Sequence, residues 1–223
     1  MNKMFAKQLG ITVEVYVDNM LVKSLTAVKH VSDLQATFDI ILAYGMRMNP
    51  EKFLFGVIKG KFLGHVISWQ GIEANPEKVQ AIMDMVVPKV RSDVQSLTGR
   101  VAALARFFFR LTDKCAPFFK LLKSQHCKLI NWGPEQDEAV RNIKEYLASV
   151  PMLSKPIPGE MLYLYLAASS TAVSSALIRK DDTMELPVYY VGKGYTLAKS
   201  RYPDLEKLAL ALIVTARKLR HYF

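Results

Sequence analysis

The spacing of apolar residues changes along the chain, and this change constrains the fold more than any other feature. Val13, Val15 and Val17 alternate with polar residues, which predicts a half-buried strand over residues 12–18. Further along, apolar residues recur three and four positions apart, which is typical of helices that bury one face. The sequence therefore predicts strands and helices in succession.

Five segments carry the helical spacing. Helices are predicted over residues 30–44, 76–87, 92–108, 134–147 and 203–219. Asn75 and Pro76 suit a helix start, and Gly45 suits a helix end. Ser92 followed by Gln95 predicts a capping box at the third helix. The last helix is expected to bury one apolar face, formed by Leu205, Leu208, Ala209, Leu212, Ala216 and Leu219.

Strand and turn signals surround these helices. Asp18 and Asn19 favour a turn, so residues 20–22 are expected to return as a second strand. Residues 61–68 resemble one strand that leads to a turn at residues 70–71.

Strands return after a proline-rich segment. Residues 149–160 hold three prolines and a glycine, which makes them the best linker candidate. Beyond them, two strands are expected, joined by a bend near Ser169. A turn at Asp181 and Asp182 then leads to a third strand over residues 188–191.

The formal net charge of +10 is unevenly distributed. Residues 76–125 hold nine Lys and Arg against four Asp and Glu, a net of +5, which is the densest surplus. Clustered cations attract nucleic acid, or they form an ordinary solvated surface, and charge alone does not separate the two. Two cysteines and four scattered histidines give neither a disulfide framework nor a zinc-ligand spacing.

The sequence shows no membrane signal. No apolar run approaches the ~20 residues that cross a bilayer, and the first ten residues have no signal-peptide core. We therefore expect an intracellular chain, cytoplasmic or nuclear, that is not secreted and has no membrane partner.

The first predicted hairpin raises a catalytic hypothesis. Nucleotidyl transfer uses divalent metals held by clustered carboxylates, and two adjacent acids at a hairpin tip can supply oxygens. Here only Asp18 is an acid, because Asn19 offers a carbonyl oxygen without a negative charge. On spacing alone, an Asx turn that closes the hairpin is the stronger interpretation.

Longer stretches resemble a known family. VEVYVDNMLVKS, residues 13–24, is similar to the palm-domain hairpin of reverse transcriptases from gypsy-type long-terminal-repeat retrotransposons. HVSDLQATFDIILAYGMRMNPEKFLFG, GKFLGHVISWQ and VQSLTGRVAALARFF resemble the following palm, primer-grip and thumb segments. LYLYLAASSTAVSSALIRKDD and PVYYVGKGYTLAKSRYPDLEKLALALIVTARKLRHYF resemble the opening of the family's ribonuclease H-like domain. These blocks occur in family order over nearly the whole chain.

The resemblance implies an α+β fold with four parts. They are the C-terminal part of a polymerase palm with the primer-grip-like hairpin (1–73), a helical thumb (74–125), a connecting helix and linker (126–160), and the N-terminal half of a ribonuclease H-like domain (161–223). Met1 would fall within the palm, after the fingers and the first catalytic aspartate of the family.

The resemblance also implies metal ligands, of which several are replaced. The family has two aspartates where this chain has Asp18 and Asn19, and a ribonuclease H aspartate where it has Ala167. Glu206 matches the family's first-helix glutamate, or it is simply a first-turn acid that favours the helix dipole. Lys52 matches a lysine near the leaving pyrophosphate. The family uses Mg²⁺, and the acids that remain are not expected to hold it.

The family's thumb tracks the minor groove of a primer–template duplex. This implies phosphate contacts for Arg100, Arg106, Arg110, Lys114, Lys120 and Lys123. Lys61 and His65 would lie beside the primer backbone in the primer-grip-like hairpin. For the thumb cations the alternative is a solvated helix face, and for the hairpin it is packing alone.

These observations predict a fragment of a retrotransposon RNA-directed DNA polymerase with a ribonuclease H-like domain, inactive as this chain. Its partners would be nucleic acid, as an RNA–DNA hybrid or DNA duplex, and the rest of the polyprotein. Two alternatives stay open: a module that binds a duplex without chemistry, and a relic without function.

Overall fold

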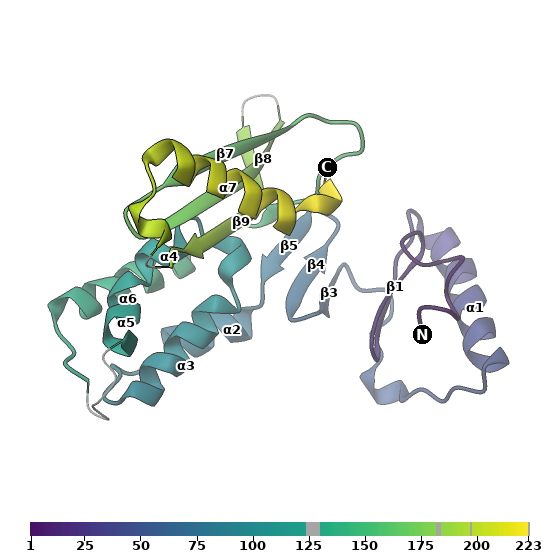
Figure 1. Ribbon diagram of the computed structural model, residues 1–223. Helices are drawn as coiled ribbons and strands as arrows, with labels where there is room; N and C mark the ends of the chain where they lie inside the picture. The colour runs from purple at the N-terminus through teal and green to yellow at the C-terminus, as the bar shows by residue number, and fades with distance from the viewer. Residues whose placement is uncertain (124–129, 182–183, 197, 223) are drawn as a thin grey trace. The chain divides into compact units, whose positions relative to one another are not determined.

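The computed structural model describes residues 1–123, 130–181, 184–196 and 198–222 (Figure 1). The chain divides into two compact units, Met1–Trp69 and Gln70–Phe223, each of which mixes helices and strands. The four-part division expected from the sequence is finer than this and stays a prediction, and its boundary at residue 125 lies outside the described residues.

The first unit opens with an antiparallel hairpin, β1 (Val13–Tyr16) and β2 (Asn19–Val22). The predicted hairpin is confirmed, but its turn lies one residue earlier than expected. Tyr16 pairs with Asn19, so Val17 and Asp18 form a two-residue loop. Val17 has φ 54 and is 74% exposed, although the alternation placed it on the buried side with Val13. The tight loop requires a left-handed residue, and this requirement overrides the preference of valine for extended backbone.

Helix α1 (Ala27–Ala43) follows the hairpin. Thr26 caps its start, because its side-chain oxygen accepts a hydrogen bond from the backbone N–H of Lys29 at 3.2 Å. Gly45, with φ 64, follows its end in the left-handed conformation that glycine adopts easily. The helix predicted over residues 30–44 is thus confirmed, with three more residues at its start.

The core of the first unit is small. Ile41 of α1 is buried with Phe5 and with Val13 of β1. Two further apolar residues of α1, Val31 and Leu42, are 69% and 72% exposed. The hairpin therefore covers only part of the apolar surface that α1 offers.

A second hairpin, β3 (Lys59–Phe62) and β4 (His65–Ser68), replaces the single strand expected over residues 61–68. Phe62 pairs with His65, and the turn residues Leu63 and Gly64 have φ 51 and φ 74. Gly64 adopts this conformation at little cost, but a left-handed leucine is uncommon. The single strand predicted from the apolar pattern is wrong, because Leu63 gives no turn signal, whereas the hairpin that the resemblance implied around Lys61 and His65 is present.

The second unit begins with a helical cluster. Its elements are α2 (Pro76–Met83), α3 (Arg91–Ala102), η2 (Ala105–Phe107), α4 (Leu111–Lys114), α5 (Ala116–Lys123) and α6 (Pro134–Ala148). Their shared core includes Val94, Leu97, Val101, Leu104, Phe107, Phe108, Phe118, Ile143 and Leu147. Within the described residues of both units, no helix is long and apolar enough to cross a membrane.

Helix α3 starts and ends differently from its prediction. Its start is capped by Asp93, whose carboxylate accepts hydrogen bonds from the backbone N–H groups of Lys89 and Val90 at 3.0 and 3.2 Å. The capping box expected from Ser92 is therefore wrong, because Ser92 already lies within the helix. The helix ends at Ala102 instead of continuing to residue 108. After this break both Phe107 and Phe108 are buried.

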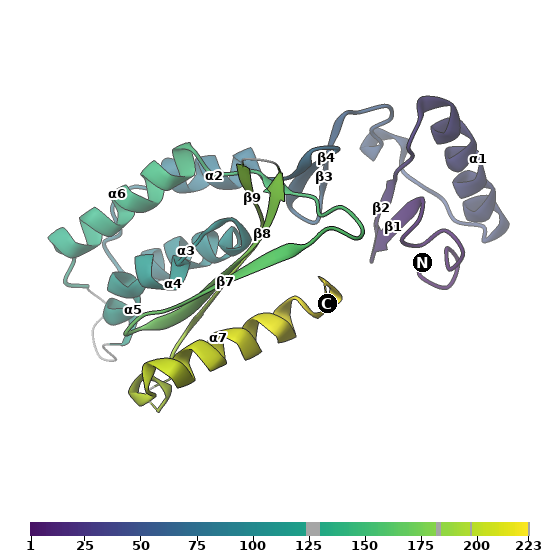
Figure 2. The same ribbon diagram turned by 90° about the horizontal axis from the view of Figure 1, so that it is seen from above.

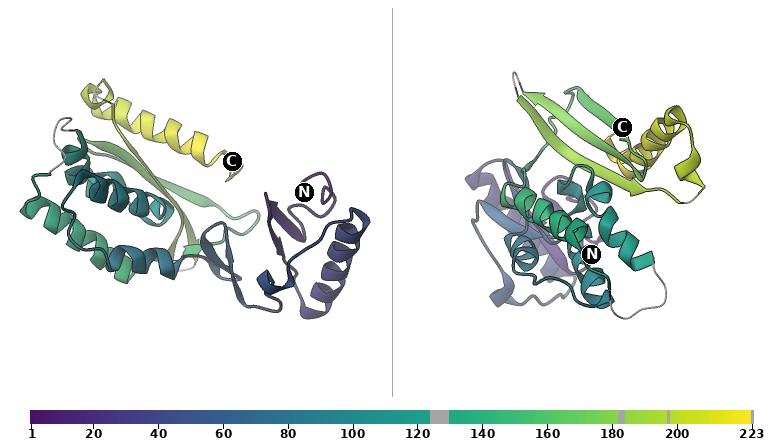
Figure 3. Two further views of the ribbon diagram at one scale, coloured as in Figure 1. Left: turned by 90° about the horizontal axis from the view of Figure 1, so that it is seen from below. Right: turned by 90° about the vertical axis from the view of Figure 1, so that its left-hand side faces the viewer.

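A three-stranded antiparallel sheet and one helix complete the second unit. The strands β7 (Leu162–Ala168), β8 (Ala172–Asp181) and β9 (Met184–Gly194) are adjacent in this order. Helix α7 (Asp204–Lys218) covers one face, and the helical cluster lies on the other (Figures 2 and 3). The three predicted strands are confirmed, and residue Asp182 of the predicted turn lies outside the described residues.

The segment expected to be a linker is packed. Its strand β6 (Leu153–Ser154) pairs with β5 (Gly71–Ala74), and Leu153 is buried. Gly71 is required there, because a Cβ would collide with the carbonyl of Leu153. At the other end of the segment, the Arg179 Nε–H donates to both carboxylate oxygens of Glu160 at 3.1 and 3.0 Å. The linker prediction is therefore wrong, since both ends of the segment are fixed to strands.

The buried face of α7 also differs from the prediction. Ala211, Thr215 and Leu219 are buried against the sheet. Of the expected face only Leu219 is buried, while Leu205 is 80% and Leu212 49% exposed. The helix is rotated so that its small residues approach β8, where the Thr215 and Ser175 hydroxyls lie 2.6 Å apart.

Two neighbouring phenylalanines allow a matched test of the helical core. Phe118 is buried and stacks on Trp132 with ring centroids 6.0 Å apart, whereas Phe119 is 39% exposed. We expect Phe118→Ala to lower the free energy of unfolding by about 3–5 kcal/mol, because it leaves a cavity. Phe119→Ala should cost about 1 kcal/mol or less. Chemical denaturation of both variants measures this, and equal losses would contradict the packing.

Candidate metal site and nucleic-acid interface

The tip of the first hairpin carries the expected acid and its amide neighbour. Asp18 and Asn19 are both exposed. The Asn19 side-chain amide donates a hydrogen bond to Asp18 Oδ1 at 3.3 Å. The amide nitrogen thus contacts the carboxylate oxygen that a second aspartate would leave free for a metal ion.

The residues present do not fit a Mg²⁺ site. Mg²⁺ binding in phosphoryl transfer depends on a cluster of carboxylates, because the cluster supplies both charge and geometry. Across the described residues, no group of three Asp, Glu, His or Cys side chains lies close enough to hold a metal ion. Asp18 is therefore a single carboxylate, with an amide in place of its partner.

Ala167 and Glu206, the two positions expected to match ribonuclease H acids, lie on strand β7 and on helix α7. Strand alternation places Ala167 on the same side of β7 as Tyr163, whereas Leu162 and Leu164 face the cluster that α7 packs against. Glu206 is exposed in the first turn of α7. Alternation thus assigns Ala167 and the helix that carries Glu206 to opposite faces of the sheet.

The remaining first-unit candidates are on short elements. Lys52 ends the 3₁₀ helix η1 (Pro50–Lys52) and is exposed. Lys61 is exposed on β3, and His65 is partly buried at the start of β4. Lys61 lies opposite Val66 in the hairpin, next to the Phe62–His65 pair that flanks the turn. The β3–β4 hairpin therefore presents these two side chains near one turn.

Three of the six cations predicted to contact phosphates have partners at the surface. Arg100 donates to the carbonyl of Ala81 at 2.7 Å, near the end of α2. Arg110 donates from Nε to Asp113 Oδ2 at 3.0 Å. Lys120 forms an exposed ion pair of 2.6 Å with Glu135. Exposed ion pairs are weak, so Lys120 remains exchangeable with a phosphate.

Two further thumb cations stack on tyrosines. The guanidinium of Arg106 lies 4.8 Å from the ring centroid of Tyr189, and the Lys114 ammonium lies 5.6 Å from that of Tyr146. Arg106 is partly buried, so it is turned toward the sheet. Lys123 is exposed at the end of α5, and among the described residues no contact of its side chain is found. Sequence spacing could not reveal the partners of the other five cations.

One cation was missed by the sequence reasoning. Arg91 donates from Nη2 to the carbonyl of Leu122 at 2.6 Å, which holds it beside the last turn of α5. Lys120 and Lys123 lie three residues apart on that helix and share one side of it. We call Arg91, Lys120 and Lys123 the basic end of α5.

A polar cluster joins α4 to the sheet, and sequence reasoning missed it too. Asp113 Oδ1 accepts hydrogen bonds from the Ser169 and Thr171 hydroxyls, both at 2.6 Å. Partial burial acts to raise the pKa of Asp113, but the hydrogen bonds from Ser169, Thr171 and Arg110 outweigh it, so the pKa lies below its usual range. The only sequence signal was the bend predicted near Ser169.

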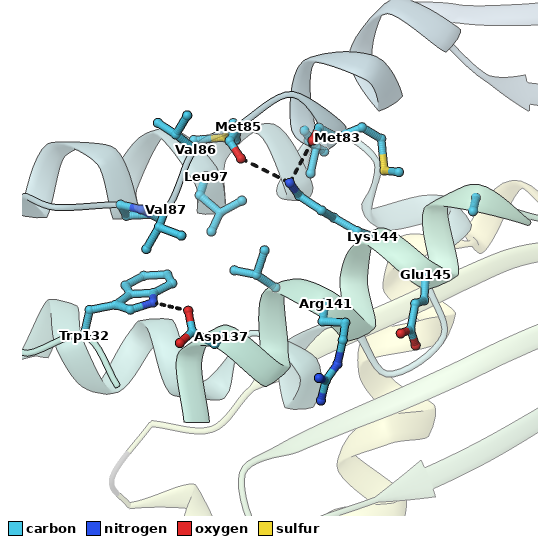
Figure 4. Close-up of a pocket in the computed structure, with 14 residues that line it drawn as sticks. Met83, Met85, Val86, Val87, Leu97, Trp132, Asp137, Arg141, Lys144 and Glu145 are labelled. Atoms are coloured by element: carbon cyan, nitrogen blue, oxygen red, sulfur yellow. Dashed lines mark hydrogen bonds between the residues drawn. The ribbon is translucent and has the colours of Figure 1, made fainter. Parts of the chain in front are cut away.

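A cavity of about 460 Å³ lies between α6 and the segment that follows α2 (Figure 4). Its walls are largely apolar and include Val86, Val87, Leu97, Trp132 and Val140. Two of its polar side chains have partners: the Lys144 ammonium donates to the carbonyls of Met83 and Met85 at 2.7 and 3.1 Å, and the Trp132 Nε1–H donates to Asp137 at 2.7 Å. The arrangement suits apolar contact and offers no catalytic pair.

Comparison with known proteins agrees with the resemblance seen in the sequence. Residues 132–223 match the family described as "RNase H-like domain found in reverse transcriptase". The Transposon Tf2-7 polyprotein of Schizosaccharomyces pombe is 29% identical over 93% of this chain, and Tf2-3 is 28% identical over the same share. The chain spans only 16% of the length of these polyproteins. The predicted similarity to a retrotransposon polyprotein is confirmed.

Solved structures share the fold. The foamy viral protease-reverse transcriptase in complex with dsDNA superposes with a TM-score of 0.82 at 21% identity, covering 98% of this chain and 46% of that one. The same protein in complex with an RNA/DNA hybrid gives a TM-score of 0.83 at 20% identity, covering 98% and 30%. At these identities the likeness concerns the fold alone.

The Asp113 cluster predicts a pH-dependent contribution to stability. We expect Asp113→Asn to lower the free energy of unfolding by about 1–3 kcal/mol near pH 7, because an amide cannot replace a carboxylate that accepts from two hydroxyls and a guanidinium. Since the pKa is depressed in the folded state, this contribution is complete above the unfolded pKa and is lost as the pH falls through the folded pKa. The difference between the two proteins should therefore shrink below about pH 4.

Denaturant titrations at several pH values measure this difference. Asp84→Asn is the matched control, because the Asp84 carboxylate accepts from Gln80 at 2.6 Å on an exposed helix end. Its effect should stay within about 0.5 kcal/mol. An Asp113→Asn effect as small as that of the control would show that the cluster does not stabilise the fold.

Proposed function

Since the chain is similar over most of its length to the reverse transcriptase and ribonuclease H region of retrotransposon polyproteins, we propose that it corresponds to part of that region and is catalytically inactive by itself. In this proposal its ancestors carried out RNA-directed DNA synthesis and cleavage of the RNA strand. The observation that carries the proposal is the lone carboxylate at the β1–β2 tip, with Asn19 bonded to it.

The chemistry supports inactivity at both ancestral centres. A two-metal mechanism needs carboxylates that bridge or flank two cations about 4 Å apart. The β1–β2 tip offers Asp18, and the sheet offers a methyl group at Ala167. Glu206 is a solvent-facing acid on α7, so it lacks the second ligand that the first strand of the sheet would have to provide.

We further propose that the second unit binds a nucleic-acid duplex without chemistry. The basic end of α5 supports this, because it gathers Arg91, Lys120 and Lys123 around one helix end. The solved relatives of similar fold are described as complexes with dsDNA and with an RNA/DNA hybrid. Binding by this surface would rest on phosphate contacts, which carry no sequence preference.

The internal partners of the cations limit the strength of such binding. Lys120 must exchange Glu135 for a phosphate, and Arg91 is already committed to the carbonyl of Leu122. Arg106 and Lys114 stack on tyrosines rather than facing outward. We therefore expect about two or three phosphate contacts, and thus a slope of log K against log salt of only about −2 to −3.

The catalytic proposal predicts that restoring one acid is not enough. We expect no primer extension above background by the purified chain with Mg²⁺ or Mn²⁺, and none by Asn19→Asp, because two acids without a third leave the metal site incomplete. Extension of a labelled primer on an RNA template measures this, with an active retroviral reverse transcriptase as positive control.

A matched variant decides the origin of any signal. Asp18→Asn removes the last acid at the β1–β2 tip while keeping the shape of the side chain. Activity that is present in the purified chain and lost in Asp18→Asn would overturn the proposal of an inactive chain. Activity that survives Asp18→Asn would come from a contaminant.

The binding proposal predicts a salt slope that responds to single cations. Fluorescence anisotropy of a labelled RNA–DNA hybrid should show saturable binding, with log K falling linearly in log salt. Lys123→Ala should reduce the slope by about 0.9, because one phosphate contact is lost. Glu135→Gln should strengthen binding, because it releases Lys120 from its ion pair.

The control for this series is Lys180→Ala. Lys180 lies on β8, where it pairs with Glu185 at 3.3 Å and sits over the ring of Tyr163. Its removal should leave the slope within error. A folded chain that shows no saturable binding at low salt would remove the binding proposal and leave the inactive relic.

A further inference from the structure

Helix α7 is apolar on two faces. Its inner face packs on the sheet through Ala211, Thr215 and Leu219. Its outer side carries a second apolar stripe with exposed fractions of 80%, 37%, 49% and 48%, formed by Leu205, Leu208, Leu212 and Ile213. We call these four residues the outer stripe. A helix that is apolar on both sides is normally covered on both.

The spacing of the outer stripe suits contact with another helix. Leu205, Leu208 and Leu212 are three and four positions apart, which is the spacing of a two-helix seam. In Figure 2, α7 lies on the sheet with its outer side turned away from the helical cluster. The outer stripe thus belongs to a continuous surface of the second unit and not to its core.

Charges at the two ends of α7 are opposite. Glu206 lies exposed in the first turn, and Arg217 lies exposed in the last turn. The two residues are eleven positions apart, which is about three turns at 3.6 residues per turn, so both side chains project from the same side, next to the outer stripe. Within the part of the chain that the structure describes, neither has an ion-pair partner, whereas Asp204 bonds Lys207 at 3.3 Å.

We propose that α7 pairs with α7 of a second copy of this chain, antiparallel and about a two-fold axis. In this arrangement the outer stripes face each other, and Glu206 of each copy meets Arg217 of the other. The symmetry forms that ion pair twice and opposes the two helix dipoles favourably. A parallel pair would bring Glu206 beside Glu206 and Arg217 beside Arg217, which is repulsive.

The size of the contact sets its strength. The helix has 15 residues, so the paired surface is about 22 Å long at 1.5 Å per residue. One helix per copy buries less than a standard stable interface. The dimer is therefore weak, depends on concentration and, because of its exposed ion pairs, weakens with salt. Its formation is independent of the proposed duplex binding.

Sedimentation velocity of the full chain over low micromolar to sub-millimolar concentrations tests the pairing without nucleic acid. The purified chain should shift from monomer to dimer. Leu212→Glu should raise the dimer dissociation constant at least about tenfold, because it buries two unpaired carboxylates at the centre of the seam. Val86→Glu is the matched control, since Val86 is an exposed valine at 82% on the rim of the cavity, and should leave the constant unaltered.

A charge exchange tests the antiparallel register. Glu206→Arg alone and Arg217→Glu alone should each weaken the dimer, because each turns two attractive pairs into two repulsive ones. The double variant Glu206→Arg with Arg217→Glu should restore it. Circular dichroism of each variant confirms that it is folded. A monomer at every concentration, a dimer insensitive to Leu212→Glu, or a double variant as weak as the single ones would each overturn the proposal.

Discussion

Three consecutive phenylalanines connect the helices of the second unit to its sheet, because Phe107 and Phe108 contact α6 and Phe109 contacts β9. Phe107 gives its carbonyl to the Tyr146 hydroxyl of α6 at 2.7 Å, and the Phe108 ring lies 4.5 Å from that of Tyr146. Phe109 reaches Tyr190 of β9, with ring centroids 5.9 Å apart. Burial, with Tyr190 nearby, raises the pKa of Tyr146 to about 12, so its hydroxyl remains a donor over the whole physiological range. The helices and the sheet are therefore positioned from one short segment.

The sequence predicted those elements whose signals are local. Asn75 accepts from the N–H of Glu77 at 2.9 Å and Gly45 is left-handed, as cap signals predict. The apolar spacing could not predict which of the two apolar faces of α7 is buried. Periodicity identifies an apolar face but not the element that packs against it. The sheet selects Ala211 and Thr215, since small side chains let α7 approach β8 and bond Ser175. The left-handed backbone of Leu63 was not predicted, because the hairpin requires this conformation and a leucine side chain does not favour it.

The features of the candidate site were also predictable from the sequence only in part. The residue identities that argue against metal chemistry, Asn19 and Ala167, are visible in the sequence as soon as the resemblance is noticed. Whether each cation is free to contact a phosphate is not visible in the sequence. Whether Lys120 faces solvent or Glu135, and whether Arg106 points outward or stacks on Tyr189, depends on contacts between distant parts of the chain. The resemblance implied six equivalent phosphate contacts, and packing makes the six cations unequal.

The hydrogen bonds of the Lys144 ammonium have a consequence for the motion of one cavity wall. It binds the carbonyl groups of Met83, the last residue of α2, and of Met85 in the segment that follows, and that segment forms one wall of the cavity. The wall and α6 are thus linked through one side chain. Opening of the cavity would release both hydrogen bonds at once, so the wall should exchange its amide hydrogens as a single cooperative unit. The amides from Met83 to Val87 would then report the opening of this cavity wall.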